Sequence, residues 1–429
     1  MSTPRTTLPP AVDRSDPGPD IFERADRALD AAGVRWCRLR DRHEGDDDLL
    51  TAPGDLPDVR TALRGVGFHE RRHLGRGTHH SFFGYDSTAG SWAKLDVVTD
   101  LAYGPWQEWP TGLASPYLGR AHRVAHEWRL EADDAFWALL LHELLDRRDP
   151  GPRRLDELAG LASAARSDGD GANVARGALR SGPPPDRIIE LARDRDAQGL
   201  AAVGGRLRRG FTRRRAIKTR ARRVSSALLR RFDRLDPPFL RPGITVALLG
   251  PDGAGKSSLA ARLGDGAPMR TRRIYLGLYG GSRRGQGPVH VLGRRVPYGT
   301  AIRLLPAMWG GWSRGWVHAR RGHLVLFDRH PFDARLADGS RGKARVRRVV
   351  LGHLLPAPDA TVVLDAPASL LVARKAEHPV EQIEQQRQRY LQLAGRLPRA
   401  TVVDVSGPLG GVATRVSAVV AMALASGSR

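Results

Sequence analysis

The stretch ITVALLGPDGAGKSSLAARL, residues 244–263, decides the fold of the C-terminal part of the chain. Residues 250–257 match the pattern GxxxxGK[ST], with an apolar run before them and a helical pattern after them. Glycines let backbone N–H groups face a phosphate, and the N-terminus of the following helix adds a positive dipole. We therefore predict a nucleotide-binding loop formed by Gly250, Asp252, Gly253, Ala254, Gly255, Lys256, Ser257 and Ser258.

Apolar runs alternate with helical patterns around this loop. The expected strands are 244–249, 273–278, 324–327, 361–364 and 401–405. Strands that are apolar on both faces are typical of a buried parallel sheet with helices on either side. The sequence thus predicts an α/β domain over 243–425, a P-loop NTPase with a doubly wound, parallel, five-stranded sheet.

Magnesium accompanies nucleotide phosphates, so a carboxylate is expected at the end of a neighbouring strand. Asp328 follows the apolar run 324–327 and is the first choice, and Asp365 is the second. In this arrangement Lys256 bridges the β- and γ-phosphates and Ser257 binds the Mg²⁺ ion together with Asp328. The plain alternative for either acid is a cap at the end of its strand.

These residues carry a family resemblance that spans about 243–425. The segment GPDGAGKSS, residues 250–258, resembles the P-loop of thymidylate kinases and their relatives, which have an acid at the third position. Asp328-Arg329-His330 resembles their Asp-Arg-X motif. The stretch LDAPASLLVARKAEHPVEQIEQQRQRYLQL, residues 364–393, resembles their fourth strand, lid and following helix.

The resemblance implies a phosphotransferase that uses ATP and Mg²⁺. Lys256 and Ser257 would hold the donor phosphates and the metal, and Asp328 would help to organise the metal and the acceptor. Arg329 would hold the acceptor's phosphate, and Asp252 would face its sugar.

Two departures from that family bear on the substrate and on catalysis. The family's Arg-Glu-Pro-Gly-Gly stretch is replaced by Gly277-Leu278-Tyr279-Gly280-Gly281, so thymidylate itself is left open. The lid has no clear second arginine, which leaves the transition-state cation open between Arg374, Lys375 and the basic stretch 337–348. We select Arg374, while a solvated charged face is the plain account of 337–348. Trp309, Trp312 and Trp316 lie in a long insertion at nearly helical spacing, which favours a core-facing stripe over an acceptor pocket.

The N-terminal part predicts a separate α+β domain, residues 19–204. Expected helices are 21–32, 57–66, 132–147, 155–166 and 186–196; expected strands are 34–39, 48–51, 79–85 and 92–98; and 167–185 is expected to be a loop. Asp46 and Asp48 are two residues apart on one strand and therefore point to the same face. Asp96, from a neighbouring strand, could complete an oxygen cage for Mg²⁺.

This pattern resembles the nucleotidyltransferase fold, in which Asp46, Asp48 and Asp96 would be the metal triad. That family has a Gly-Ser pair upstream of the acids, and here residues 38–44 read RLRDRHE instead. A solvated acidic surface is the alternative.

The composition of the chain excludes several classes of protein. With 429 residues, 41% apolar and 27% charged, the chain is neither wholly disordered nor collagen-like. No run of 18 apolar residues is present, so we expect no transmembrane segment. Residues 1–18 are expected to be a disordered leader without the apolar core of a signal peptide. A single cysteine, Cys37, excludes an internal disulfide and favours a cytoplasmic location.

The net charge is +23, which reflects either an arginine-rich composition or attraction to phosphates. Residues 205–242 are expected to be a basic helical linker, and 206–234 hold thirteen Arg and Lys against one acid. Apolar residues interrupt this run at rough helical spacing. It is therefore either a solvated helix or a surface for anionic lipid or polyphosphate.

Three functions remain open. The first is an ATP- and Mg²⁺-dependent kinase acting on a nucleoside monophosphate or a related small molecule. The second is nucleotidyl transfer to a small molecule by the N-terminal domain, with the P-loop domain regulatory. The third is a nucleotide-controlled module that docks on an anionic surface through 206–234. A homodimer is the assembly considered.

Overall fold

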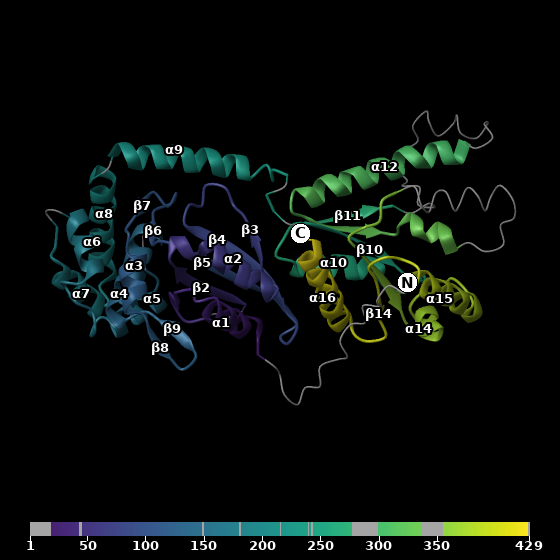
Figure 1. The fold of residues 1–429 in the computed structure, drawn as a ribbon, viewed down its shortest axis with the longest axis horizontal. Coiled ribbons are helices and arrows are strands. Elements are labelled where there is room, and N and C mark those ends of the chain that lie inside the picture. The colour runs from purple at the N-terminus through teal and green to yellow at the C-terminus, as the bar shows by residue number, and fades with distance from the viewer. Residues whose placement is uncertain are drawn as a thin grey trace. The chain divides into compact units, whose positions relative to one another are not determined.

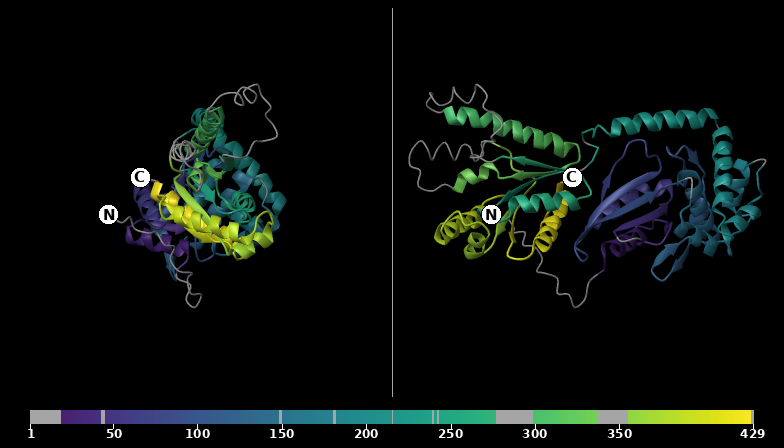
Figure 2. Two further views of the ribbon diagram at one scale, coloured as in Figure 1. Left: turned by 90° about the vertical axis from the view of Figure 1, so that its right-hand side faces the viewer. Right: turned by 180° about the vertical axis from the view of Figure 1, so that it is seen from behind.

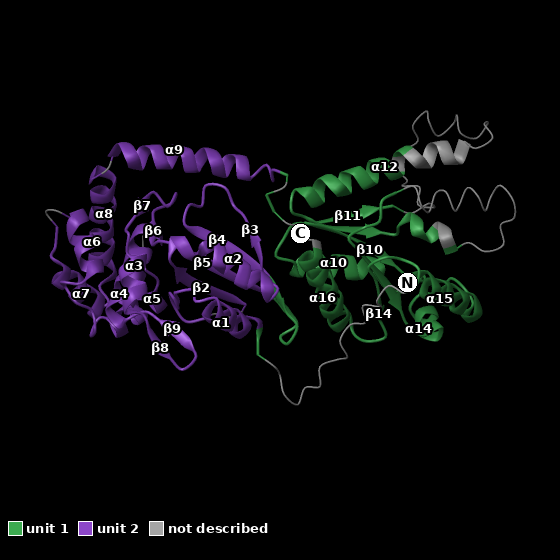
Figure 3. Ribbon diagram, viewed as in Figure 1, with its two compact units in different colours: residues 1–20, 84–92, 238–429 green, residues 21–83, 93–237 purple. Residues whose placement is uncertain are grey.

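The computed structural model describes residues 19–42, 45–147, 150–179, 182–214, 216–238, 240–241, 243–276, 299–336 and 355–427. The chain divides into two compact units (Figure 3). The P-loop unit comprises 1–20, 84–92 and 238–429, and the N-terminal unit comprises 21–83 and 93–237.

The P-loop unit is built on a five-stranded sheet in the order β11-β12-β10-β13-β14 (Figure 1). Its strands are β10 Ile244–Leu249, β11 Thr271–Tyr275, β12 Leu324–Asp328, β13 Ala360–Asp365 and β14 Ala400–Asp404. All adjacent strands are parallel. The predicted parallel five-stranded sheet is therefore confirmed.

Helices cover both faces of this sheet (Figures 1 and 2). They are α10 Lys256–Gly266, α12 Gly299–Arg320, α14 Ala368–Arg374, α15 Val380–Ala394 and α16 Leu409–Gly427, with a short 3₁₀ helix, η3, at Pro331–Leu336. Ile244, Val246 and Leu248 of β10 pack in one core cluster with residues of α10 and α16. Ala247 faces the opposite side and packs with residues of α12. Period-2 alternation in a strand thus produces two buried faces.

Two details of this unit differ from expectation or bear on it. Trp309 and Trp316 are each 41% exposed, whereas Trp312 packs against the core, so the predicted core-facing tryptophan stripe is wrong. At about 100° per residue the three side chains fall within about 60° of one another, so they share one side of α12, but of the three only Trp312 packs against this core. Within the described residues, one helix segment, Leu409–Ser426, is long and apolar enough to cross a membrane, and 28% of it is buried.

The N-terminal unit has a seven-stranded mixed sheet in the order β3-β4-β5-β2-β1-β9-β8. Its strands are β1 Trp36–Arg38, β2 Asp46–Thr51, β3 His69–Arg71, β4 His79–Asp86, β5 Ser91–Val98, β8 His122–Val124 and β9 Glu127–Arg129, and a separate pair is β6 Ala102–Tyr103 with β7 Trp109–Pro110. On one face, α1 Ile21–Ala31 and α2 Leu56–Gly65 bury Leu49, Leu95 and Val97. On the other face, Leu50 and Val98 join a larger helical core.

That helical core is formed by α3 Ala114–Arg120, α4 Ala132–His142, the π-helical turn η2 Glu143–Arg147, α5 Pro152–Leu161, α6 Asp170–Leu179, α7 Pro185–Arg193 and α8 Ala197–Arg214. The loop predicted at 167–185 is wrong, because it contains α6. Ala172, Ala175 and Ala178 of α6 are buried, so packing of small side chains outweighs the local glycines. The boundary predicted after residue 204 falls inside α8, whose Val203 and Leu207 are buried. A last helix, α9 Ala216–Asp233, follows.

Candidate functional site

The loop 250–257 leaves β10 and enters α10 with a backbone that requires glycine. Gly250, Gly253 and Gly255 have φ values of 146°, 85° and 77°. A Cβ on Gly250 would lie 2.7 Å from the Leu364 carbonyl oxygen, and a Cβ on Gly253 would clash with the backbone of Leu371. Only glycine fits these positions, which supports a loop whose amides face an anion at the start of α10.

Lys256 is the first residue of α10, and its amine lies over this loop. Nζ donates hydrogen bonds of 2.8 Å to the carbonyl oxygens of Gly250 and Pro251. Burial, together with the nearby Arg329 guanidinium, lowers the pKa of Lys256 to about 8. The amine is thus a cation that the loop's own carbonyls hold in place, where an incoming polyanion can take it over.

Oxygen donors from two elements meet beside the loop. The Ser257 hydroxyl lies 3.5 Å from the Asp328 carboxylate at the end of β12. Arg273 of β11 contacts both groups. Its Nη2 donates a 2.6 Å hydrogen bond to the Ser257 hydroxyl, and its Nε donates a 3.1 Å hydrogen bond to the Asp328 carboxylate. A cationic group therefore lies between a hydroxyl and a carboxylate, which are the ligands that Mg²⁺ prefers. These residues fit a magnesium ion by the chemistry of their donors.

The predicted acceptor side also comes together in the structure. Arg329 Nη2 donates to Asp252 at 2.8 Å. Arg329 has φ of 66°, a left-handed conformation that is costly for a residue with a side chain. Asp333 of η3 was not predicted; burial raises its pKa to about 6, and it accepts a 3.1 Å hydrogen bond from Tyr390. In the sequence, the position of Asp333 as an acid five residues after Asp328 is what could have indicated it.

The arginines of the lid region are held by other groups. Arg374 donates to the carbonyl oxygen of Val405 at 2.9 Å, and its role as transition-state cation stays a prediction. Arg387 of α15, which was not singled out, makes a bidentate pair with Asp365 at 2.7 and 3.1 Å. Asp365 is thus paired with Arg387 as Asp328 is paired with Arg273, but Asp328 also lies 3.5 Å from the Ser257 hydroxyl, which favours it as the metal carboxylate. The stretches 277–281 and 337–348 lie outside the described residues.

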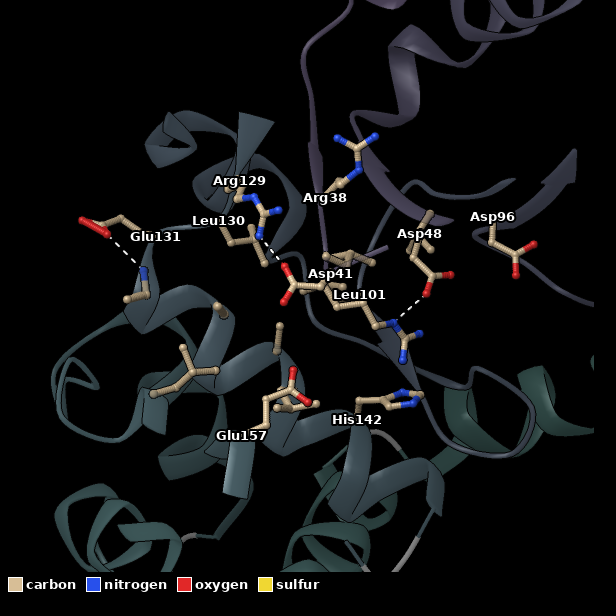
Figure 4. Close-up of a pocket in the computed structure, with 18 of the residues that line it drawn as sticks. Arg38, Asp41, Asp48, Asp96, Leu101, Arg129, Leu130, Glu131, His142 and Glu157 are labelled. Carbon is tan, nitrogen blue, oxygen red and sulfur yellow. Dashed lines mark hydrogen bonds and ion pairs between the residues drawn. The ribbon is translucent and has the colours of Figure 1, made fainter. Parts of the chain in front are cut away.

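The N-terminal unit contains a cavity of about 650 Å³ (Figure 4). Leu39, Val98, Leu101, Leu130 and Leu139 form much of its apolar wall. Its polar groups include Arg40, Asp48, His79, Asp96, Arg129, His142, Asp146 and Glu157. Apolar walls with a few converging polar groups are typical of a small-molecule site.

The parallel pairing of β2 with β5 brings the predicted carboxylates together. Asp48 and Asp96 are directly opposite in register and both line the cavity, whereas Asp46 is not among its lining residues. Each acid has a basic partner: Arg40 donates to Asp48 at 2.6 Å, and Lys94 lies 2.5 Å from Asp96 and 3.3 Å from Asp46.

In the part of the chain that the structure describes, no group of three or more His, Cys, Asp or Glu side chains has the arrangement of a metal site. The oxygen donors are of the type that suits Mg²⁺, but Arg40 and Lys94 already pair with them. The metal triad therefore stays a prediction.

The middle acid of the same strand has a structural role. Asp47 points to the opposite face of β2, where Arg38 Nε donates to it at 2.9 Å and Arg38 Nη2 donates to Asp26 at 2.8 Å. Arg38 is 2% exposed and Asp47 is 3% exposed. Burial raises the pKa of Asp26 to about 6 despite the nearby arginine. This buried ion cluster holds β1, β2 and α1 together.

A histidine–aspartate pair in the cavity was missed by sequence reasoning. Asp146 Oδ2 lies 3.0 Å from His142 Nδ1, and its Oδ1 accepts a 2.5 Å hydrogen bond from the Gly104 amide. An ionised carboxylate only accepts, so this contact favours the tautomer with the proton on Nδ1 and leaves Nε2 as an acceptor. Burial lowers the pKa of the neighbouring His79 to about 4, although Asp96, Asp146 and Asp48 oppose the shift. In the sequence, the four-residue spacing of His142 and Asp146 within a predicted helix is the pattern that could have indicated this pair.

Comparisons with solved structures find kinases. Thymidylate kinase from Candida albicans matches with 17% identity and a TM-score of 0.32, covering 42% of this chain and 92% of that chain. Deoxyadenosine kinase from M. mycoides, with products dCMP and dCDP bound, matches with 14% identity and a TM-score of 0.29 over 41% of this chain and 97% of that chain. The same kinase with dATP bound has a TM-score of 0.30. No protein-family model and no curated protein matches the chain.

Proposed function

We propose that the P-loop unit transfers the γ-phosphoryl group of ATP to a nucleoside monophosphate or a related phosphorylated small molecule. The observation that carries this proposal is the loop 250–257, with Lys256 above it and the Ser257–Asp328 pair beside it. The acceptor oxygen bonds to the γ-phosphorus while the bond to the β,γ-bridging oxygen breaks. The products are ADP and the phosphorylated acceptor.

Each residue has a role in this reaction. The loop amides and Lys256 hold the donor phosphates, while Ser257 and Asp328 hold Mg²⁺. When bound, Mg²⁺ neutralises charge on the β- and γ-phosphates. Arg329, held by Asp252, holds the acceptor's phosphate, and Arg374 is our choice for the cation that stabilises the transferring group. Positioning and charge neutralisation supply the catalysis, without a covalent intermediate on the protein.

A panel of candidate acceptors with γ-labelled ATP tests this proposal. We expect label to move to one class of phosphorylated acceptor, and Lys256→Ala to abolish the transfer while circular dichroism stays unchanged. Lys218→Ala, which removes an exposed lysine of α9, is the matched control and should keep most activity. Transfer by Lys256→Ala at the wild-type rate would exclude the proposal.

The cavity of the N-terminal unit supports a second candidate, nucleotidyl transfer from a nucleoside triphosphate to a small molecule. Asp48 and Asp96, opposite each other in a cavity of about 650 Å³, favour it, and His142 is placed to accept the acceptor's proton. Asp46→Asn with Asp48→Asn should stop incorporation of nucleotide into the acceptor while ATP turnover by the P-loop unit persists. Asp55→Asn with Asp58→Asn likewise changes one partly buried and one exposed acid of the same unit, neither of which lines the cavity, and should change neither activity.

A further inference from the structure

Helix α9 presents its apolar side chains outward. Six of the fifteen large apolar side chains that are exposed in the described residues lie between 217 and 235. Ile217 is 87% exposed, Leu228 63% and Phe232 54%, and Val224, Leu229 and Leu235 complete the set. Soluble proteins rarely gather so many exposed apolar groups in one place without a partner.

The opposite face of α9 is polar and attached to the N-terminal unit. Arg223 donates to the buried Glu108 at 2.6 Å. Arg230 donates to the carbonyl oxygens of Gly75 at 2.9 Å and Pro105 at 2.6 Å. Asp233 accepts from the Leu74 amide at 3.0 Å. Ion pairs and hydrogen bonds therefore hold the inner face, which is the reverse of an ordinary surface helix.

Helical periodicity separates the two faces. At about 100° per residue, Ile217, Val224 and Leu228 fall within about 40° of one another. Arg223 and Arg230 fall on the opposite side of the helix by the same count. By the same count, exposed Arg220 and Arg231 border the apolar stripe on one side, and exposed Lys218 lies about 100° from its centre on the other side.

We infer that α9 binds the surface of an anionic lipid bilayer, with its apolar stripe in the headgroup region and its flanking cations at the lipid phosphates. An apolar stripe bordered by Lys and Arg is the pattern of an interfacial helix. Anionic headgroups complement a segment that holds thirteen basic residues and one acid. A nucleic acid would pair with the cations but would leave Ile217, Leu228 and Phe232 in water, so the apolar stripe favours lipid.

Vesicle sedimentation of the full chain tests this inference. We expect binding to phosphatidylcholine vesicles that contain about a third phosphatidylserine, and at least about tenfold weaker binding to pure phosphatidylcholine. Lys218→Gln, Arg220→Gln and Arg231→Gln together should weaken binding by about 100-fold. Arg153→Gln, Arg187→Gln and Arg396→Gln remove the same charge from exposed positions elsewhere and should have little effect.

A second pair of variants separates lipid insertion from charge attraction. Ile217→Ser with Leu228→Ser should weaken binding to anionic vesicles by at least about tenfold, whereas Val124→Ser with Val402→Ser should not. If the Ile217→Ser, Leu228→Ser variant keeps wild-type vesicle binding, the apolar stripe does not insert and the inference fails. Equal binding of the wild type to single-stranded RNA and to vesicles, with no effect of these serines on either, would instead identify a polyanion surface. ATP turnover should be unchanged in every variant, so a failure here is distinct from failure of the proposed kinase activity.

Discussion

The carboxylates of the P-loop site and those of the N-terminal cavity have different surroundings. In the P-loop unit, Asp328 ends a parallel strand and its arginine partner, Arg273, also contacts the Ser257 hydroxyl. In the N-terminal unit, Asp48 lies within β2 and is paired with Arg40. Asp47, the preceding residue, belongs to a buried ion cluster with Arg38. The first site is assembled mainly from one contiguous loop, and the second from several distant segments. We therefore expect mutations in these two sites to have effects of different size on stability and on activity.

The largest effect is expected in the buried ion cluster of the N-terminal unit. Arg38→Ala leaves Asp47 and Asp26 without their main cation and should lower the free energy of unfolding of this unit by about 3–5 kcal/mol. Urea unfolding followed by circular dichroism measures it. Arg35→Ala, at an exposed position on the same segment, is the control and should change stability by less than about 0.5 kcal/mol. An equal effect of both variants would mean that the cluster is not the source of stability.

The next largest effect is expected at the P-loop site. Asp328→Asn should lower phosphoryl transfer about 100- to 1,000-fold, because the neutral amide is a poor Mg²⁺ ligand. Adding excess EDTA to the wild type should remove the activity, and excess Mg²⁺ should restore it. Thermal unfolding of Asp328→Asn should stay within a few degrees of the wild type. A variant that keeps full turnover would rule out Asp328 as the metal carboxylate.

A smaller, pH-dependent effect is expected at Asp333. Its pKa is raised from the ordinary 3.8 to about 6, so between about pH 4 and 6 the folded protein binds more protons than the unfolded chain. Stability should therefore fall as the pH rises through this interval. Asp333→Asn should remove about 1–2 kcal/mol of that dependence, measured by urea unfolding at pH 4.5 and 7.5. Asp26, whose pKa is also raised to about 6, contributes to the slope that remains.

The smallest effect is expected at Arg387, which pairs with Asp365 near the surface. Arg387→Ala should lower the free energy of unfolding by about 0.5–1 kcal/mol, because partly exposed ion pairs contribute little. Turnover should change by less than about threefold, since Asp365 holds the guanidinium bidentately. A loss near 100-fold would instead identify Arg387, rather than Arg374, as the cation that acts on the transferring phosphoryl group.

The P-loop site could be predicted because its chemistry lies in consecutive residues. The motif at 250–257 and the acid that ends an apolar strand are local patterns, and parallel pairing of β10 with β12 brings them to one edge. Arg273 and Arg387 were missed, because an arginine in a strand or helix carries no local mark of the carboxylate it will meet.

The N-terminal cavity shows the limit of the same reasoning. Alternation in β2 predicted correctly that Asp46 and Asp48 share a face, and the sheet register places Asp96 opposite Asp48. The wall that faces them comes from α4 and η2, about 90 residues along the chain from β2, so only tertiary packing brings His142 and Asp146 there. Lys94 shares a face with Asp96 by alternation within β5, and Arg40 reaches Asp48 through the pairing of β1 with β2.

The amine of Lys256 has a consequence for calorimetry. With a pKa of about 8, a sizeable fraction of this amine carries no proton in mildly alkaline buffer. A polyanion that displaces the Gly250 and Pro251 carbonyl oxygens favours the charged form, so association at pH 8 must draw protons from solution. The apparent heat of association then depends on the ionisation enthalpy of the buffer, and affinity declines towards high pH. The resting loop thus couples anion capture to proton uptake.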